Sequence, residues 1–190
     1  MNGRVSPSDQ TGKRLEWLKR LAPGAQRIGH LYNESSAAET AALKRIVEMG
    51  THVGFELQPV AVRLASDIEP TIARAAKEGM QAMAVAPSTM LAANSQRVVD
   101  AMAKARMPAI YPNSEFANLG GVLSYGPDLR VAFTLMGAYV ARILKGAKPA
   151  DLPVEQSEKY ELVANVAAAK RQGITIPQDV LGLADRVIDS

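Results

Sequence analysis

The stretch PAIYPNSEFANLGGVLSYG, residues 108–126, carries the pattern on which the fold assignment rests. Its short apolar run 109–111 predicts a β-strand that ends at Pro112 in a polar turn. A pair of glycines then precedes a second short strand, 122–125, which stops at a Gly-Pro pair. Each predicted strand bears a tyrosine near its end, polar residues lie between the two strands, and no catalytic triad accompanies them.

Upstream of this stretch, predicted helices and strands alternate along the chain. Apolar periodicity predicts the helices, and short apolar runs predict buried strands. The helices are expected at 11–25, 35–50, 66–79 and 94–107, and the strands at 26–33, 51–62, 80–87 and 108–111. Two helices show the pattern of a capping box followed by a glycine stop. The expected boxes are Ser36 to Glu39 and Ser66 to Glu69, and the expected stops are Gly50 and Gly79.

Downstream, the pattern changes to a long amphipathic helix at 128–146. Its apolar stripe consists of Leu129, Phe133, Met136, Val140 and Ile143. The Pro-rich polar stretch 147–160 is long for a connection and is expected to cross between two bodies. A strand at 160–166 follows, and short helices are expected at 167–173 and 176–189.

Alternation of strand and helix at this spacing predicts parallel strands joined by helical crossovers. The fold class is therefore α/β, with an open parallel, flavodoxin-like (Rossmann-like) sheet and flanking helices. The carboxyl ends of parallel strands share one edge, and open α/β sheets bind their ligands there. Segments 32–36, 86–90 and 111–115 are expected to meet at that edge.

Composition and missing motifs exclude several function classes. The 190 residues carry a net charge of only +3 and few aromatic residues, which disfavours nucleic-acid binding. Cysteine is absent, no apolar run approaches a membrane span, and no glycine-rich phosphate loop or nucleophile elbow occurs. Neither His30 nor His52 has an acidic partner at a telling spacing. We therefore expect no catalytic residues, no metal and no cofactor, and the protein is not expected to be an enzyme.

The candidate ligand-binding residues lie in the polar segments that follow the strands. For most of them, capping or turn formation is an equally good interpretation. Tyr111 could pack in the core or reach a cleft, and Glu115 could cap a helix or meet a ligand ammonium group. The candidate set is Asn33, Ser35, Ser36, Ser88, Thr89, Tyr111, Asn113, Glu115, Ser124 and Tyr125.

Several segments resemble the ABC-transporter substrate-binding proteins of the tryptophan/tyrosine-binding type. GKRLEWLKRLAPGAQRIGHLYN (12–33) and the stretch 108–126 carry part of the resemblance. The most specific part is ARILKGAKPADLPVEQ (141–156) followed by ELVANVAAAKRQGITIP (161–177), which resembles the C-terminal signature of that family. The resemblance covers about residues 11–189.

The resemblance implies a type I periplasmic-binding fold, in which two flavodoxin-like lobes close on a small solute without chemistry. Residues 1–10 would be a polar tail, and 11–111 the second lobe. Residues 112–159 would contain the crossing segment with a strand and helix of the first lobe, and 160–190 would return to the second lobe. Tyr111 to Glu115 would then line the cleft, with Ser124 and Tyr125 on the first lobe near the hinge.

Two departures from the family pattern matter. Family members are longer and carry a signal peptide and most of the first lobe before the GKRLE helix, so this chain resembles their C-terminal part. Many relatives also have an acidic residue after the proline of the third-strand loop, where this sequence has Ser88. The resemblance implies a periplasmic or extracytoplasmic location. The chain shows no signal peptide, so a genuine start at Met1 would imply a cytoplasmic one.

Three hypotheses about function follow. The first is the solute-binding component of an ABC uptake transporter, which takes a small solute, an amino acid among the candidates, to a membrane permease. The second is an enzyme on a flavodoxin-like domain, which a turnover assay would identify. The third is an orphan half-protein that forms a homodimer or binds a partner through apolar faces left bare, which concentration-dependent mass would reveal.

Overall fold

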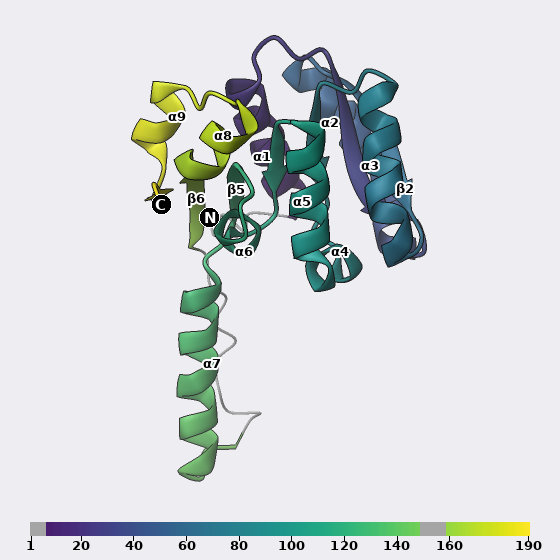
Figure 1. Cartoon of the computed structure of the whole chain (residues 1–190). Helices are drawn as coiled ribbons and strands as arrows, with labels where there is room; N and C mark the ends of the chain where they lie inside the picture. Colours follow the sequence, from purple (N-terminus) through teal and green to yellow (C-terminus); the bar gives the residue numbers. More distant parts are fainter. Residues whose placement is uncertain (1–6, 149–158) are drawn as a thin grey trace.

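The structure of the chain, a computed structural model, describes residues 7–148 and 159–190 (Figure 1). Within these residues the strands form one seven-stranded sheet in the order β2-β1-β3-β4-β5-β6-β7. The strands are β1 (Arg27–Asn33), β2 (Glu56–Val62), β3 (Ala82–Val85), β4 (Ala109–Tyr111), β5 (Leu123–Pro127), β6 (Tyr160–Asn165) and β7 (Arg186–Ile188).

The sheet is mostly parallel. The pairs β1–β2, β1–β3, β3–β4 and β4–β5 are all parallel, so the first five strands have the flavodoxin-like order 2-1-3-4-5. β6 runs antiparallel to β5, and β7 runs parallel to β6. The predicted fold class, an open α/β sheet of the flavodoxin type with flanking helices, is confirmed.

Helices cover both faces of the sheet, and one helix, α7, extends away from it (Figure 1). The helices of the described residues are α1 (Pro7–Leu21), α2 (Ala37–Val53), α3 (Ile68–Lys77), α4 (Thr89–Ala93), α5 (Ser95–Ala105), α6 (Ser114–Asn118), α7 (Leu129–Leu144), α8 (Val166–Gln172) and α9 (Gln178–Leu183), with a short 3₁₀ turn, η1 (Ala65–Asp67). On one face, Leu15 and Leu18 of α1 pack with Ile28 of β1. On the other, Ile72 of α3 and Met102 of α5 pack with further strand residues. Because parallel strands are buried on both faces, β3 is buried at every position.

Several helix termini differ from the sequence-based expectation. Helix α1 begins at Pro7, so the expected polar tail is helical over its last residues. Helix α2 passes through Gly50 and ends at Gly54, whose φ of 84° provides the left-handed C-cap. Gly50 instead allows close packing, because a Cβ atom there would lie 2.5 Å from the Cβ atom of Leu57 on β2.

The capping box expected at Ser66 and Glu69 is wrong. The carboxylate of Asp67 accepts the Leu64 N–H, while Glu69 pairs with Arg97 of α5. The single helix expected over 176–189 is also wrong, since α9 ends at Leu183 and β7 follows it. Helix α4 was not predicted, because it is a single short turn before α5.

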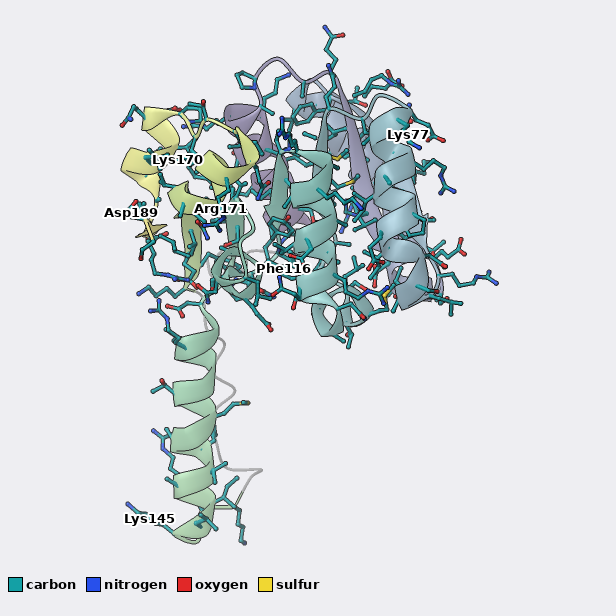
Figure 2. All side chains as sticks on the ribbon, in the orientation of Figure 1. Lys77, Phe116, Lys145, Lys170, Arg171 and Asp189 are labelled. Carbon is teal, nitrogen blue, oxygen red and sulfur yellow. The ribbon has the colours of Figure 1, made fainter. Side chains whose placement is uncertain are left out.

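The assignment of residues 122–125 to a first-lobe strand is wrong. β5 pairs with β4 on one side and β6 on the other, so it is an interior strand of the same sheet. The predicted crossing at 147–160 falls mostly outside the described residues. Helix α7 leaves the sheet after β5 and extends away from it, with Lys145 at its far end (Figure 2). Its side chains Met136, Val140, Ile143 and Leu144 are exposed.

Candidate functional site

Five parallel strands end at one edge of the sheet, here called the carboxyl edge. β1 ends at Asn33, β2 at Val62, β3 at Val85, β4 at Tyr111 and β5 at Pro127. Antiparallel β6 starts at the same edge with Tyr160, the register partner of Pro127. The predicted meeting of segments 32–36, 86–90 and 111–115 is therefore confirmed by the strand directions.

The turn after β1 uses its polar groups locally. The side chain of Asn33 accepts the Ser35 N–H at 3.0 Å, and Ser36 caps α2 by accepting the Glu39 N–H at 3.3 Å. The Glu39 carboxylate accepts the Asn33 N–H at 2.8 Å, not that of Ser36 as the expected capping box would require. The capping interpretation thus accounts for the side chains of Asn33 and Ser36, and Ser35 is exposed.

The loop after β3 behaves differently. Ser88 is 4% exposed, and its hydroxyl oxygen has no hydrogen-bond partner among the described residues. The neighbouring Thr89 is exposed. A buried hydroxyl without a partner loses its hydration without compensation. The Ser88 hydroxyl therefore retains hydrogen-bonding capacity that no other described residue uses.

The turn after β4 separates a core residue from an exposed one. The ring of Tyr111 is 2% exposed and stacks on Phe116 with ring centroids 5.2 Å apart. Burial raises the pKa of the Tyr111 hydroxyl. Of the two alternatives for Tyr111, core packing or a position in a cleft, the structure favours core packing. Asn113 caps α6 by accepting the Glu115 N–H at 3.1 Å, while the side chain of Glu115 is exposed at the edge.

β5 carries the last two candidates on opposite faces of the sheet, because side chains alternate along a strand. Ser124 is fully buried, and its hydroxyl oxygen has no partner among the described residues. Tyr125 lies on the α1 face, where its ring stacks on Tyr160 at 5.9 Å and approaches Trp17 at 6.5 Å. Partial burial raises the pKa of Tyr125. The two residues therefore cannot form one contact surface.

A buried carboxylate on β6 was missed by the sequence analysis. Glu161 is 3% exposed, and its Oε2 atom accepts a hydrogen bond from Arg130 Nη2 at 3.2 Å. Its Oε1 atom has no partner within the described part of the chain. Arg130 also donates to both carboxylate oxygens of Asp128, each at 3.1 Å. These hydrogen bonds lower the pKa of Asp128. The signal in the sequence was an acidic residue inside the apolar strand YELVAN.

A buried guanidinium group was missed as well. Arg14 of α1 is 3% exposed, and its Nη2 atom donates to the Thr11 hydroxyl at 3.0 Å. Burial lowers the pKa of Arg14 to about 10, and the nearby Tyr125 and Tyr160 partly oppose this shift. The sequence carried a usable signal, because Arg14 occupies the same helical face as Leu18 and Leu21 at i+4 and i+7.

The carboxyl edge therefore combines exposed and orphaned polar groups. Three buried oxygen atoms near it, those of Ser88, Ser124 and Glu161, lack a full set of partners among the described residues. In the same part of the chain, no group of three His, Cys, Asp or Glu side chains is arranged to hold a metal ion. No helix among the described residues has both the length and the apolarity needed to cross a bilayer.

A doubly wound sheet with polar groups gathered at its carboxyl edge defines an α/β ligand-binding protein. The family follows from comparison with known sequences. The model of the ABC transporter substrate-binding protein family matches residues 3–188, so the chain belongs to that family. The recognition made from the sequence is confirmed.

Known proteins give the same assignment. The chain is 22% identical over 154 residues to the tyrosine-binding protein of Clostridioides difficile. The aligned region spans 80% of this chain and 44% of that protein. It also resembles the ABC domain from Streptococcus pneumonia solved with L-Trp, at 27% identity and a TM-score of 0.79. A conserved domain protein from Vibrio cholerae gives a TM-score of 0.79 at 24% identity and supports the fold.

The chain spans only part of these relatives. It covers 44% of the tyrosine-binding protein and 60% of each of the two solved structures, while 94% and 93% of its own length is matched by them. The described residues supply one sheet with one carboxyl edge, and the matched relatives contain further sequence.

Proposed function

We propose that this chain is the solute-binding part of an ABC uptake system, and that it binds a small solute at the carboxyl edge without chemical conversion. Membership of the family supports a binding role. The observation that carries the proposal is the set of orphaned buried oxygens of Ser88, Ser124 and Glu161 at this edge. A ligand with hydrogen-bond donors would complete their bonding.

The proposed solute is an amino acid with an aromatic side chain. The matched relatives include a protein named for tyrosine binding and a structure that contains L-Trp. In this chain, the carboxylates of Glu161 and Glu115 offer acceptors for an ammonium group. The proposed mechanism is closure of the first lobe over the edge, with ligand contacts shifting an open–closed equilibrium. The proposed partner is a membrane permease, and the proposed location is extracytoplasmic.

The test is a titration of the protein with L-tyrosine, followed by backbone amide NMR shifts. We expect saturable shifts at residues 86–89, 113–115 and 124–128, and none at the opposite edge around Arg27. Glu161→Gln should weaken binding by about tenfold or more, because a charged hydrogen bond contributes about 1.5–3 kcal/mol. Glu56→Gln is the matched control, since this carboxylate is 63% exposed at the amino end of β2. Shifts confined to other surfaces, or equal effects of the two variants, would refute the proposal.

A second candidate function is a dimerising α/β module. It is favoured by one observation, the exposed apolar side chains of Met136, Val140 and Leu144 on α7, which extends away from the sheet (Figure 1). Sedimentation velocity over a hundredfold range of concentration distinguishes the two candidates. A dimer that Val140→Gln dissociates would support this candidate, and a monomer at every concentration would eliminate it.

A further inference from the structure

A cavity lies below the carboxyl edge on the face covered by α1 and α2. Its volume is about 260 Å³, and it is bounded by Thr11 of α1, His30 of β1 and the segment that follows β3. Its third wall is α2, whose residues Ala42 and Ile46 line it. Strands β1 and β3 are neighbours in the sheet. The chain continues from β1 to β2 on one side and from β3 to β4 on the other, so the strand order reverses between them. Open sheets of this order bind ligands at such a switch point.

The floor of the cavity holds an unsatisfied histidine. His30 is 3% exposed, and its Nδ1 atom has no hydrogen-bond partner among the described residues. Burial and the nearby charge of Arg14 lower the pKa of His30 to about 4, so the imidazole is neutral at pH 7. A neutral imidazole has one donor and one acceptor nitrogen. A hydroxyl group can bond to either nitrogen, because it both donates and accepts.

The charges around the cavity favour an anion. Two guanidinium groups lie near it: Arg45 lines it, and the buried Arg14 donates to the lining residue Thr11. Neither guanidinium group takes part in the ion pairs found among the described residues. One carboxylate, that of Glu39, also lines the cavity, and it accepts the Asn33 N–H at 2.8 Å. Two positive groups against one negative group leave an excess of one positive charge.

The remaining lining is aliphatic. Ala38, Ala42, Ile46 and Met49 place one apolar stripe of α2 along the cavity. A cavity with apolar walls and a few polar groups at defined positions is typical of a small-molecule site. At about 260 Å³ it is near the lower end of the range of such sites, so its ligand is small.

We propose that this cavity binds a small hydroxy-carboxylate, with the carboxylate at Arg45, an apolar chain along α2 and the hydroxyl group at His30. The cavity shares the segment after β3 with the contacts proposed for the transported solute, since Ala86 and Pro87 line it and Ser88 is the next residue. The other walls of the cavity, formed by α1, His30 and α2, take no part in the solute contacts, and neither proposal requires the other. Ser124 and Glu161 lie on the opposite face of the sheet, so Glu161→Gln tests the solute contacts and Arg45→Gln tests the cavity.

The probe is ω-hydroxyhexanoate, whose flexible chain adapts to the separation of the two polar ends. Because the chain contains only two histidines, long-range imidazole ¹⁵N spectra resolve His30 from the exposed His52. We expect saturable shifts of His30 only. Hexanoate, which lacks the hydroxyl, should bind about fivefold more weakly, and the cation ω-aminohexanol should not compete.

Three variants complete the test. Arg45→Gln should weaken binding about fivefold. Lys44→Gln removes an equal charge from the preceding residue of α2 and should leave binding unchanged. Ala42→Met fills the cavity and should abolish binding, while circular dichroism verifies that the protein is folded. The proposal is overturned if His30 shows no saturable shift. It is also overturned if Arg45→Gln and Lys44→Gln behave alike, or if Ala42→Met binds as the wild type does.

Discussion

A Cβ atom on Gly126 would lie 1.7 Å from the carbonyl oxygen of Pro112. The backbone of β5 therefore touches the backbone of the turn that follows β4, and these two segments form the centre of the carboxyl edge. Side-chain movement cannot relieve an overlap between a Cβ atom and a backbone oxygen. Glycine at position 126 is therefore what allows β5 and the turn after β4 to approach this closely.

The first prediction concerns this contact. Gly126→Ala should lower the free energy of unfolding by about 2–4 kcal/mol, because the strand or the turn must move. Urea unfolding, followed by the fluorescence of the single tryptophan, measures the loss. Gly137→Ala on α7 is the control, since a Cβ atom there would meet nothing within 4 Å. An unchanged urea midpoint for Gly126→Ala would show that the two segments do not approach this closely in solution.

The second prediction concerns acid stability. His30 has a pKa of about 4 in the folded protein against an ordinary 6.5, because burial disfavours the charged imidazole. The unfolded chain therefore binds the proton first, and stability should fall as the pH drops from 6.5 towards 4. The shift corresponds to a loss of about 3 kcal/mol.

The measurement is urea unfolding at a series of pH values. His30→Gln should flatten the pH dependence in this window, whereas His52→Gln should preserve it because His52 is exposed. Equal pH slopes for the wild type and His30→Gln would contradict the buried, neutral state of His30.

The third prediction concerns the cluster at the start of α7. Arg130→Gln should raise the pKa of Asp128, because both carboxylate oxygens lose a hydrogen bond from the guanidinium group. Asp128 has a lowered pKa in the folded state, so its contribution to stability is present above the unfolded pKa and is lost as the pH falls. The variant should therefore lose more stability at pH 7 than at pH 3. Carboxyl ¹³C NMR titration measures the pKa directly.

The control for Arg130→Gln is a substitution in an exposed ion pair. Arg97 of α5 pairs with Glu69 of α3, with 2.8 Å between Nε and Oε1, and both side chains are about half exposed. Arg97→Gln should reduce stability by less than about 1 kcal/mol, because solvent screens an exposed pair. If Arg130→Gln leaves the titration of Asp128 unchanged, the hydrogen bonds described here do not persist in solution.

The fourth prediction concerns α7 itself. This helix has 16 residues and extends away from the sheet (Figure 1). Helices of about this length are marginal in water without tertiary packing. Its amide hydrogens should exchange faster than those of β1 by several orders of magnitude. Hydrogen exchange measured by NMR checks this, and equal protection of α7 and β1 would indicate a packing partner, such as a second copy of the chain.

Much of the fold was predictable because local signals agreed with it. The helix-strand alternation gave the positions of the first five strands to within a few residues, since each strand is an apolar run between glycine or proline signals. Gly50 was wrongly predicted to end its helix, because a glycine that permits close packing has the same sequence signature as a glycine that ends a helix. The placement of β5 could not be read from its sequence, since pairing with β4 is a long-range property.

The candidate site was predictable in part. Polar residues after the strands do lie at one edge. The side-chain oxygens of Asn33, Ser36 and Asn113, however, accept hydrogen bonds from nearby backbone N–H groups. Spacing alone cannot separate these caps from ligand contacts. Arg14 and Glu161 were missed, and His30 was set aside for lack of an acidic partner, because burial of a polar side chain cannot be read from spacing. Glu161 Oε1 and His30 Nδ1 also lack hydrogen-bond partners among the described residues.

The point where α7 leaves the sheet has a consequence for protein engineering. Pro127 and Tyr160 are register partners on β5 and β6, and the Asp128 N–H donates to the Lys159 carbonyl oxygen at 2.9 Å. The two strands are thus the arms of a β-hairpin, with the whole of 128–159 inserted at its tip. A tight Asn-Gly turn has the geometry to join such arms directly. The sheet should therefore tolerate a graft of another peptide or domain between Pro127 and Tyr160.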